Sequence, residues 1–291
     1  MKRGAYMNIT RPRFAKGVTG EIFMFHCARA RGWGLLFKSS EGNGIGMDQP
    51  IEKALSSLHA RRMKGFFAEN VPEANRRIME LIPPDAVVGI GDSTSMRQLG
   101  ILDLLRERGT AILNPFEPKP EEMAIPDYGR ERARIMKEAT SCTVFLTGSN
   151  ALTEDGRLVN VDAVGNRVAG MFWGHPLSIV VVGRNKVVRD LDQAFERIRK
   201  LIAPTHFHIR TAVLGGKKRA TPCVATGKCN DCRSEDKGCN IFTIIEGKPA
   251  QTALHVVLVN RDLGLGWDPS WPDERIAGIV EMYKNFVWIP A

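Results

Sequence analysis

The fold is decided by the stretch Ala86-Val87-Val88-Gly89-Ile90-Gly91-Asp92-Ser93-Thr94, residues 86–94. Its first six residues form a short apolar run, which is typical of a strand that helices cover on both faces of a sheet. Asp92 and Ser93 follow, and both residue types cap the N-terminus of a helix. We therefore predict a strand, a tight turn and a capped helix that runs through Leu105, which is the repeating unit of an α/β protein.

The same alternation continues on both sides of this stretch. Apolar runs predict strands at residues 65–68, 110–113, 142–147, 158–161, 178–182, 241–245 and 254–259. Amphipathic spacing predicts helices at residues 51–63, 72–81, 128–138, 166–172, 190–202 and 272–288. This order predicts an α/β fold with a mostly parallel sheet flanked by helices. We interpret the cysteine-rich segment after Pro204, with the last two strands, as a flap that closes the main sheet.

Composition and charge exclude several classes of protein. The chain has 291 residues, of which 43% are hydrophobic and 25% charged, so it is neither disordered as a whole nor collagen-like. Residues 1–46 contain eight Lys/Arg and two Asp/Glu and supply most of the net charge of +9. The nearly neutral remainder argues against a nucleic-acid-binding surface. No apolar run approaches the ~20 residues of a membrane span, and residues 21–28 are too short and polar for a signal peptide, so we expect a cytoplasmic protein.

Composition and hydrophobic periodicity divide the chain into three parts. Residues 1–46 are basic and Gly-rich without a helical or strand period, so we expect a disordered extension, or a start site placed upstream of the natural Met47. Residues 47–260 form the α/β domain, which includes a cysteine-rich loop at 215–240. Residues 261–291 form a C-terminal tail that ends in an amphipathic helix.

The cysteines are concentrated in one loop. Four of the six lie within 17 residues, at Cys223, Cys229, Cys232 and Cys239. Thiolates bind Zn²⁺ or hold an iron-sulfur cluster, and Lys228, Arg233 and Lys237 would offset the negative charge of such a site. The sequence predicts a [4Fe-4S] cluster here, with a structural zinc ion, or redox-active or metal-free cysteines, as alternatives. We expect His206 and His208 to alternate in a strand and not to bind this metal.

The turn that follows the strand predicted at residues 86–91 is the first candidate ligand site. Glycine at a strand end lets the backbone approach a ligand, and the next helix offers unpaired N–H groups and about half a positive charge. A phosphate or a small carboxylate would fit there, since open α/β sheets bind ligands at the carboxyl ends of their strands. The candidate residues are Gly89, Gly91, Asp92, Ser93 and Thr94. A plain helix cap is the alternative, because the turn is neither a dinucleotide-binding motif nor a P-loop.

A second group of polar residues follows the strand predicted at 142–147. Arg167 can pair with a substrate carboxylate or phosphate through two hydrogen bonds, while Asp162 or Glu154 can act as a base or an orienting group. The other candidate ligand-binding residues are Thr147, Gly148, Ser149, Asn150, Asn160 and Asn166. The alternative is structural, with Asp155-Gly156 as a hairpin turn and Asp162 as a helix cap.

These motifs together resemble the LUD domain family, formerly DUF162, which includes the lactate-utilisation protein C of bacterial iron-sulfur operons. The resemblance covers residues 50–260 and is carried by residues 88–93, 147–156, 158–162, 165–169 and 221–240. It implies a Rossmann-like sheet similar to that of sugar-phosphate isomerases and CoA transferases, with the site at the strand ends. It also implies a role beside an iron-sulfur oxidoreductase that converts L-lactate to pyruvate.

Two functions are compatible with these residues. In the first, the cysteine loop holds a cluster, the glycine turn and Arg167 bind a small carboxylate, and electrons pass to or from an iron-sulfur partner protein. The chain would then be a component of the oxidation of L-lactate or a related hydroxy acid. In the second, a structural zinc ion stabilises the cysteine loop. The chain is then an isomerase-type or transferase-type enzyme for a phosphorylated or CoA-linked acid.

Overall fold

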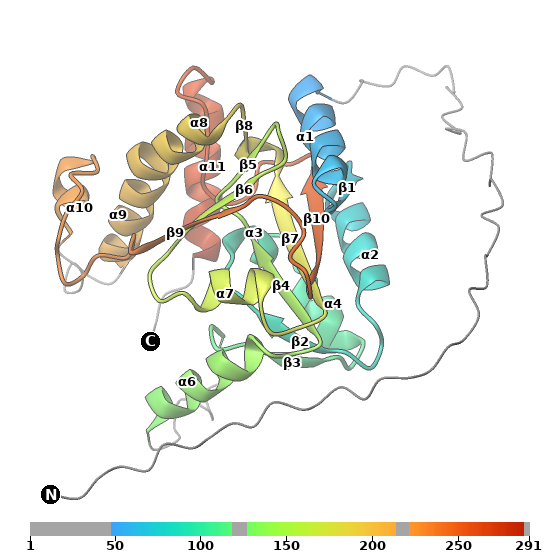
Figure 1. Cartoon of the computed structure of the whole chain (residues 1–291). Coiled ribbons are helices and arrows are strands. Elements are labelled where there is room, and N and C mark those ends of the chain that lie inside the picture. Colours follow the sequence, from blue (N-terminus) through green and yellow to red (C-terminus); the bar gives the residue numbers. More distant parts are fainter. Residues whose placement is uncertain (1–47, 118–126, 214–220, 288–291) are drawn as a thin grey trace, which may run out of the picture. The chain divides into compact units, whose positions relative to one another are not determined.

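The main sheet carries six parallel strands in the order β1-β10-β7-β4-β2-β3. The structure is a computed structural model that describes residues 48–117, 127–213 and 221–287 (Figure 1). The predicted basic extension at residues 1–46 lies outside the described residues. The six strands are β1 (Lys64–Ala68), β2 (Val87–Ile90), β3 (Ala111–Leu113), β4 (Val144–Gly148), β7 (Leu177–Gly183) and β10 (Ala253–Val259). The predicted α/β fold with a parallel sheet is therefore confirmed.

Both faces of this sheet are buried, as the apolar strands predict. Along β7, Ile179 and Val181 pack into the core of one face, and Val180 and Val182 pack into the core of the other. The first face is covered by α2 (Val71–Leu81), α3 (Thr94–Arg97) and α4 (Ile101–Glu107). The second is covered by α1 (Gln49–Ala60) and α7 (Asn166–Phe172). A further helix, α6 (Tyr128–Ala139), contacts β2 and β3 (Figure 1).

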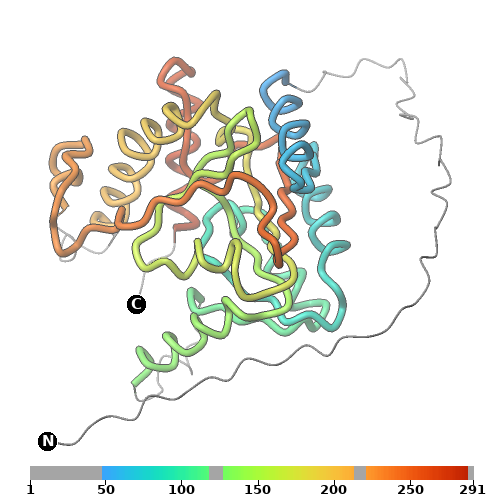
Figure 2. Tube along the Cα trace, in the orientation of Figure 1, coloured from blue at the N-terminus to red at the C-terminus, as the bar shows by residue number. Residues whose placement is uncertain are grey.

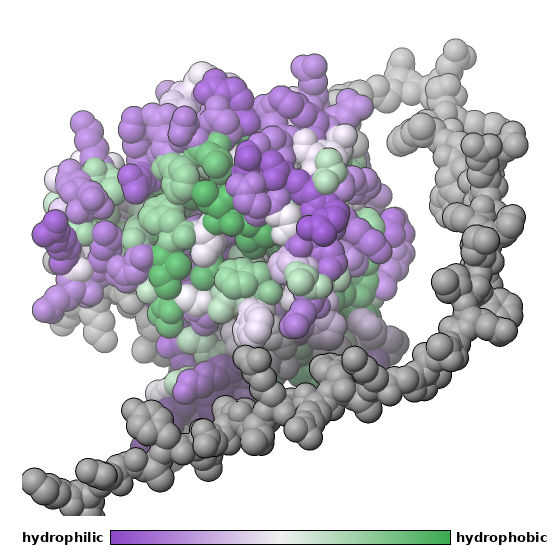
Figure 3. Space-filling view, in the orientation of Figure 1, coloured by the Kyte–Doolittle hydropathy of each residue, from purple (hydrophilic) through white to green (hydrophobic). Residues whose placement is uncertain are grey.

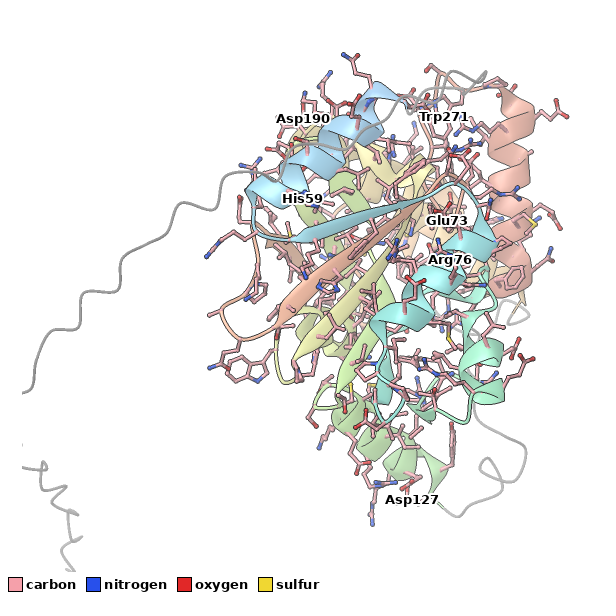
Figure 4. The ribbon with its side chains drawn as sticks, turned by 90° about the vertical axis from the view of Figure 1, so that its right-hand side faces the viewer. His59, Glu73, Arg76, Asp127, Asp190 and Trp271 are labelled. Carbon is pink, nitrogen blue, oxygen red and sulfur yellow. The ribbon has the colours of Figure 1, made fainter. Side chains whose placement is uncertain are left out.

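The helices of these layers expose their polar sides. Figure 4 faces α1 and α2, and labels Glu73 and Arg76 on α2, where the two side chains form an exposed ion pair of 3.8 Å. Asn70 caps this helix, because its side-chain oxygen accepts the backbone N–H of Glu73 at 3.0 Å. Ala74 and Ile78 lie on the opposite side of the helix and are fully buried. Polar and apolar positions thus separate with the helical period.

A second sheet of four strands, in the order β8-β5-β6-β9, packs on the α1 side of the main sheet. Its strands are β5 (Ala151–Thr153), β6 (Leu158–Asp162), β8 (Val187–Val188) and β9 (Ile241–Ile245). Its far side is covered by α8 (Leu191–Arg197), the π-helical η2 (Ile198–Ile202), α9 (Ala203–Val213) and α11 (Asp273–Phe286). Antiparallel β5 and β6 join through Asp155-Gly156, so the hairpin alternative is correct. Hydrophobic residues gather near the outer strand β9 on the face shown in Figure 3.

The helix predicted from Asp92 through Leu105 is wrong in one respect, since the structure has two helices there. α3 ends at Arg97, and α4 begins at Ile101. Between them Gly100 has φ of +67°, a left-handed conformation that glycine adopts without a steric cost. Met96 and Ile101 nevertheless pack into the same core cluster, so the apolar pattern continues across the break and did not reveal it.

The predictions for the C-terminal third need two corrections. β10 lies inside the main sheet, between β1 and β7, so the last two strands do not form a flap. The helix predicted to end at residue 202 continues through η2 into α9, although Pro204 lies in it. The π-helical turn ends at Ile202, two residues before this proline, so the regular hydrogen-bond ladder is already interrupted there. His206 and His208 therefore lie on α9, and the strand predicted for them is wrong.

The described part of the chain contains no helix that is both long enough and apolar enough to cross a membrane.

Gly89 is required by the close packing of α6 on β2. An added Cβ would lie 2.1 Å from the carbonyl oxygen of Ala139, a backbone atom that cannot rotate away. We expect Gly89→Ala to cost at least about 3 kcal/mol of unfolding free energy and to lower the thermal midpoint by roughly 6 °C or more. In the matched control Gly278→Ala, on an exposed side of α11, an added Cβ meets no atom within 4 Å. Equal midpoints for the two variants would contradict this packing.

Candidate functional site

A cavity of about 360 Å³ lies at the carboxyl ends of the central strands. From β2 the chain runs through α3 and α4 to β3 on one face of the main sheet. From β4 it runs through β5, β6 and α7 to β7 on the other face. The ends of the neighbouring strands β2 and β4 therefore mark a switch point, which is where open α/β sheets bind ligands. The cavity has a size that suits a small molecule.

Most of the sequence-predicted ligand residues meet in this cavity. They come from the turn after β2, the turn after β4 and the loop between β6 and α7, which lie far apart in the sequence. The predicted residues that line the cavity are Asp92, Ser93, Thr94, Gly148, Ser149, Asn150, Asp162, Asn166 and Arg167. Polar residues that were predicted separately from three strand ends thus lie around one cavity.

Arg167 fastens the strand ends that frame the cavity. Its Nη1 donates to the carbonyl oxygen of Gly148 at 3.1 Å and to Asn160 Oδ1 at 2.9 Å. Its Nη2 donates to Asn150 Oδ1 at 3.1 Å and to the carbonyl oxygen of Val161 at 2.6 Å. Burial lowers the pKa of Arg167. Because its terminal nitrogens are bonded to protein acceptors, Arg167 adds positive charge to the wall while it holds β4 and β6 together.

The two carboxylates of the wall have partners of their own. Asp92 forms an ion pair with Arg97 of α3. Asp162 accepts three backbone N–H groups at the start of α7, from Val164, Gly165 and Val168. Its Oδ2 also lies 3.8 Å from Nε of Arg167. Asp162 therefore caps a helix, as the structural alternative predicts, and an anionic ligand would meet little uncompensated negative charge from these two side chains.

Five candidate residues do not line the cavity. Glu154 pairs with Lys53 of α1 at 2.9 Å. Gly89 and Gly91 are needed for packing, since a Cβ on Gly91 would lie 2.6 Å from Thr147 Oγ1. Thr147 and Asn160 are fully buried beneath the wall. Asn160 reaches the site indirectly, because it accepts a hydrogen bond from Arg167.

Lys186 is a cavity residue that the sequence interpretation missed. It ends the 3₁₀ turn η1 (Arg184–Lys186) that directly follows β7. Its Nζ is buried and lies 2.7 Å from both Ser95 Oγ and the carbonyl oxygen of Ser149. Burial, and then the charge of Arg167, lower the pKa of Lys186 to about 7. The signal was present in the sequence, since Lys186 follows an apolar strand just as Ser93 does.

Residues from the C-terminal third complete the wall. His206 and Arg210 come from α9 and Tyr283 from α11. Nδ1 of His206 and the hydroxyl of Tyr283 lie 2.6 Å apart, within hydrogen-bond distance. Burial raises the pKa of Tyr283, so its hydroxyl keeps its proton near neutral pH. No local sequence signal marks these three residues, because they reach the cavity only through the packing of α9 and α11.

The four clustered cysteines line a second cavity, of about 220 Å³. Cys223 is buried at the start of α10 (Pro222–Thr226), which packs against α9. Figure 2 shows residues 221–240 beside α9. Burial, and then the neighbouring Cys229 and Cys223, raise the pKa of Cys239 to about 11. The described cysteines are free thiols, and no three metal-binding side chains of the described residues lie at ligating separation.

The two cavities share a wall. Gly238 and Cys239 line both, as do Ala203 and Phe207 of α9. The next residue, Asn240, donates its backbone N–H to the carbonyl oxygen of Asp162 at 3.1 Å, and its side chain donates to that of Ala163 at 3.3 Å. The end of the cysteine loop is thus fastened to the loop that frames the first cavity.

Comparison with known proteins identifies a family. The profile of the LUD domain matches residues 51–259, which is more than two thirds of the chain. The crystal structure of a DUF162 family protein from Deinococcus radiodurans is 11% identical in sequence to this chain. That match covers 74% of this chain and 99% of the other, with a TM-score of 0.40. No curated protein matches the chain significantly.

Proposed function

Because the chain belongs to the LUD domain family, we propose that it is a redox component in the oxidation of L-lactate or a related small hydroxy acid. In this proposal the cysteine cavity holds a [4Fe-4S] cluster, and the first cavity binds the acid. An iron-sulfur partner protein exchanges electrons with the cluster.

The donor set of the second cavity supports an iron-sulfur centre. The residues that would hold it are Cys223, Cys229, Cys232 and Cys239. Thiolates are the ligands that such clusters require, and Lys237 lines the same cavity and would offset part of the negative charge. When bound, the cluster supplies one-electron transfer. A tetrathiolate zinc site would use the same four residues.

The composition of the first cavity supports an anionic ligand. Arg167 and Arg210 bring positive charge to its wall, while Asp92 is paired with Arg97. The hydroxyl groups that follow β2 can donate hydrogen bonds to carboxylate oxygens. A small carboxylate is therefore a better occupant than a cation or an apolar molecule.

The single observation that carries the proposal is the wall shared by the two cavities. Cys239 contributes to both, so an acid in the first cavity would lie next to a ligand of the metal centre in the second. Such proximity is what electron transfer between a bound acid and a cluster requires. A metal with only a structural role in the cysteine loop would not need to lie beside the ligand cavity.

The proposal is tested by anaerobic purification of the full chain, followed by iron, zinc and acid-labile sulfide analysis. We expect about four iron and four sulfide per chain, with an absorption that dithionite bleaches. L-lactate or pyruvate is then added to the reduced protein, and the electron paramagnetic resonance spectrum is recorded. We expect either acid to shift the spectrum, whereas sodium chloride at equal ionic strength leaves it unchanged.

The alternatives give different results. Stoichiometric zinc without sulfide would reject the redox role and support the isomerase-type or transferase-type function with a structural zinc ion. An iron-sulfur spectrum that neither acid changes would reject the placement of the acid beside the cluster. A protein that binds neither metal nor acid would reject the proposal as a whole.

A further inference from the structure

We propose that Lys186 is a nucleophile that forms a covalent imine with a small 2-oxo acid bound in the first cavity. The inference rests on the proposed function only for the use of this cavity by a small acid. It adds a catalytic residue and narrows the ligand to acids that carry a carbonyl group.

The surroundings of Lys186 favour the neutral amine that a nucleophile must be. Its side chain is buried, and Nζ has two neutral partners, the Ser95 hydroxyl and the Ser149 carbonyl group, both at 2.7 Å. Within the described ranges no carboxylate forms an ion pair with it. Burial and the charge of Arg167 bring the pKa of Lys186 to about 7. A large fraction of the amine is therefore unprotonated near neutral pH, unlike that of an ordinary surface lysine.

Lys186 also borders the first cavity. The residues that line this cavity include Gly264, which follows β10. A Cβ on Gly264 would lie 3.0 Å from Nζ and 2.7 Å from Ser95 Oγ. The absence of a side chain on Gly264 thus leaves room for the end of Lys186 and for the Ser95 hydroxyl.

The same wall carries groups that suit the carboxylate of a 2-oxo acid. Arg210 and Arg167 provide positive charge, and Ser93 and Thr94 provide hydroxyl donors. A carboxylate held by these groups would bring the adjacent carbonyl carbon toward the end of Lys186. An aldehyde or ketone without a carboxylate lacks this anchor.

The step requires no further reactant. The lone pair of Nζ forms a C–N bond to the carbonyl carbon while the C–O π bond opens. The carbonyl oxygen then leaves as water with the two protons that the amine loses, and a C=N bond replaces the C=O bond. The hydroxyl of Ser95, 2.7 Å from Nζ, is placed to pass a proton from nitrogen to oxygen.

The test is reductive trapping on the full chain, purified anaerobically. The protein is incubated with pyruvate and cyanoborohydride, and its intact mass is measured, followed by peptide mapping. We expect one adduct per chain, with the mass of pyruvic acid less one oxygen atom, on the peptide that contains Lys186. Lys186→Arg should abolish this adduct. Lys200→Met, which removes an exposed lysine paired with Glu196, should not affect it.

Two results would overturn the inference. An adduct that maps to other lysines in the unaltered chain would do so, whether or not the Lys186 variant folds. So would the absence of an adduct while pyruvate still shifts the spectrum of the metal centre, and in that case the proposed function stands without the covalent step. If pyruvate is trapped on Lys186 but no metal is present, the inference holds and the redox role fails.

Discussion

Cys232→Ser is expected to strip the full chain of its iron and sulfide and of its visible absorption. Four thiolates hold a [4Fe-4S] cluster, and a serine oxygen is a poor replacement for one of them. Cys232 lines the second cavity with the other three cysteines, and it is not one of the buried residues of the core. The substitution should therefore act on the metal centre and leave the main sheet folded. Iron and sulfide analysis and the absorption spectrum measure the loss.

The matched control is Cys142→Ser. Cys142 is buried beside β4, away from the second cavity, and its sulfur donates to the carbonyl oxygens of Ala139 and Val144 at 3.0 Å. A serine hydroxyl can donate to the same acceptors, so we expect this variant to keep its full metal content. If Cys232→Ser kept its iron, sulfide and colour, the assignment of this cysteine would be wrong. Equal metal loss in both variants would point to a general folding defect.

Arg167→Met is expected to lower the unfolding free energy by about 3–5 kcal/mol. The methionine keeps much of the packing of the arginine stem but removes a donor from four acceptors, of which Asn150 Oδ1 and Asn160 Oδ1 each keep a backbone N–H donor. Two of these acceptors are the backbone carbonyl oxygens of Gly148 and Val161, and each unpaired buried group carries a desolvation cost. Asp162 also loses the nearest positive charge. Urea denaturation followed by circular dichroism measures the change.

Arg130→Met is the control for this substitution. The side chain of Arg130 is 87% exposed and pairs with Asp127 at the protein surface, where ion pairs contribute little. We expect its unfolding free energy to stay within about 0.5 kcal/mol of the unaltered chain. An Arg167→Met variant as stable as the control, but with weakened binding of pyruvate, would show that Arg167 binds the ligand and does not hold the strands.

Local sequence patterns predicted most of the elements because the strands are short, apolar and bounded by polar turns. Residues 166–172 are helical as predicted, and the strand predicted at 241–245 is β9 with the same limits. What the pattern did not contain was the order of the strands. Nothing in the run at 254–259 distinguishes an edge strand from a central one, since both of its neighbours, β1 and β7, are set by tertiary contacts.

The sequence predicted the polar site residues that directly follow a strand. It did not predict the residues that reach the cavity only through tertiary packing. Ser93 and Ser149 line the cavity because they follow β2 and β4. Gly89 resembled a ligand-binding glycine, but its missing side chain makes room for α6. Arg167 carries the charge that was expected of it, yet the acceptors around it are recognisable only in three dimensions. Tyr283 reaches the cavity from a helix more than 100 residues farther along the chain.

The position of β10 has a consequence for how the chain acquires its structure during synthesis. β10 pairs with β7 along its whole length and with β1 over residues 255–259, so the six-stranded sheet cannot close until residues 253–259 have left the ribosome. Until then the nascent chain presents two unpaired strand edges, which are sites for association with other chains. Parallel pairing over such sequence separations is slow. A ribosome that stalls shortly before residue 253 should therefore release a chain that aggregates or is captured by chaperones, although most of its elements have already been made.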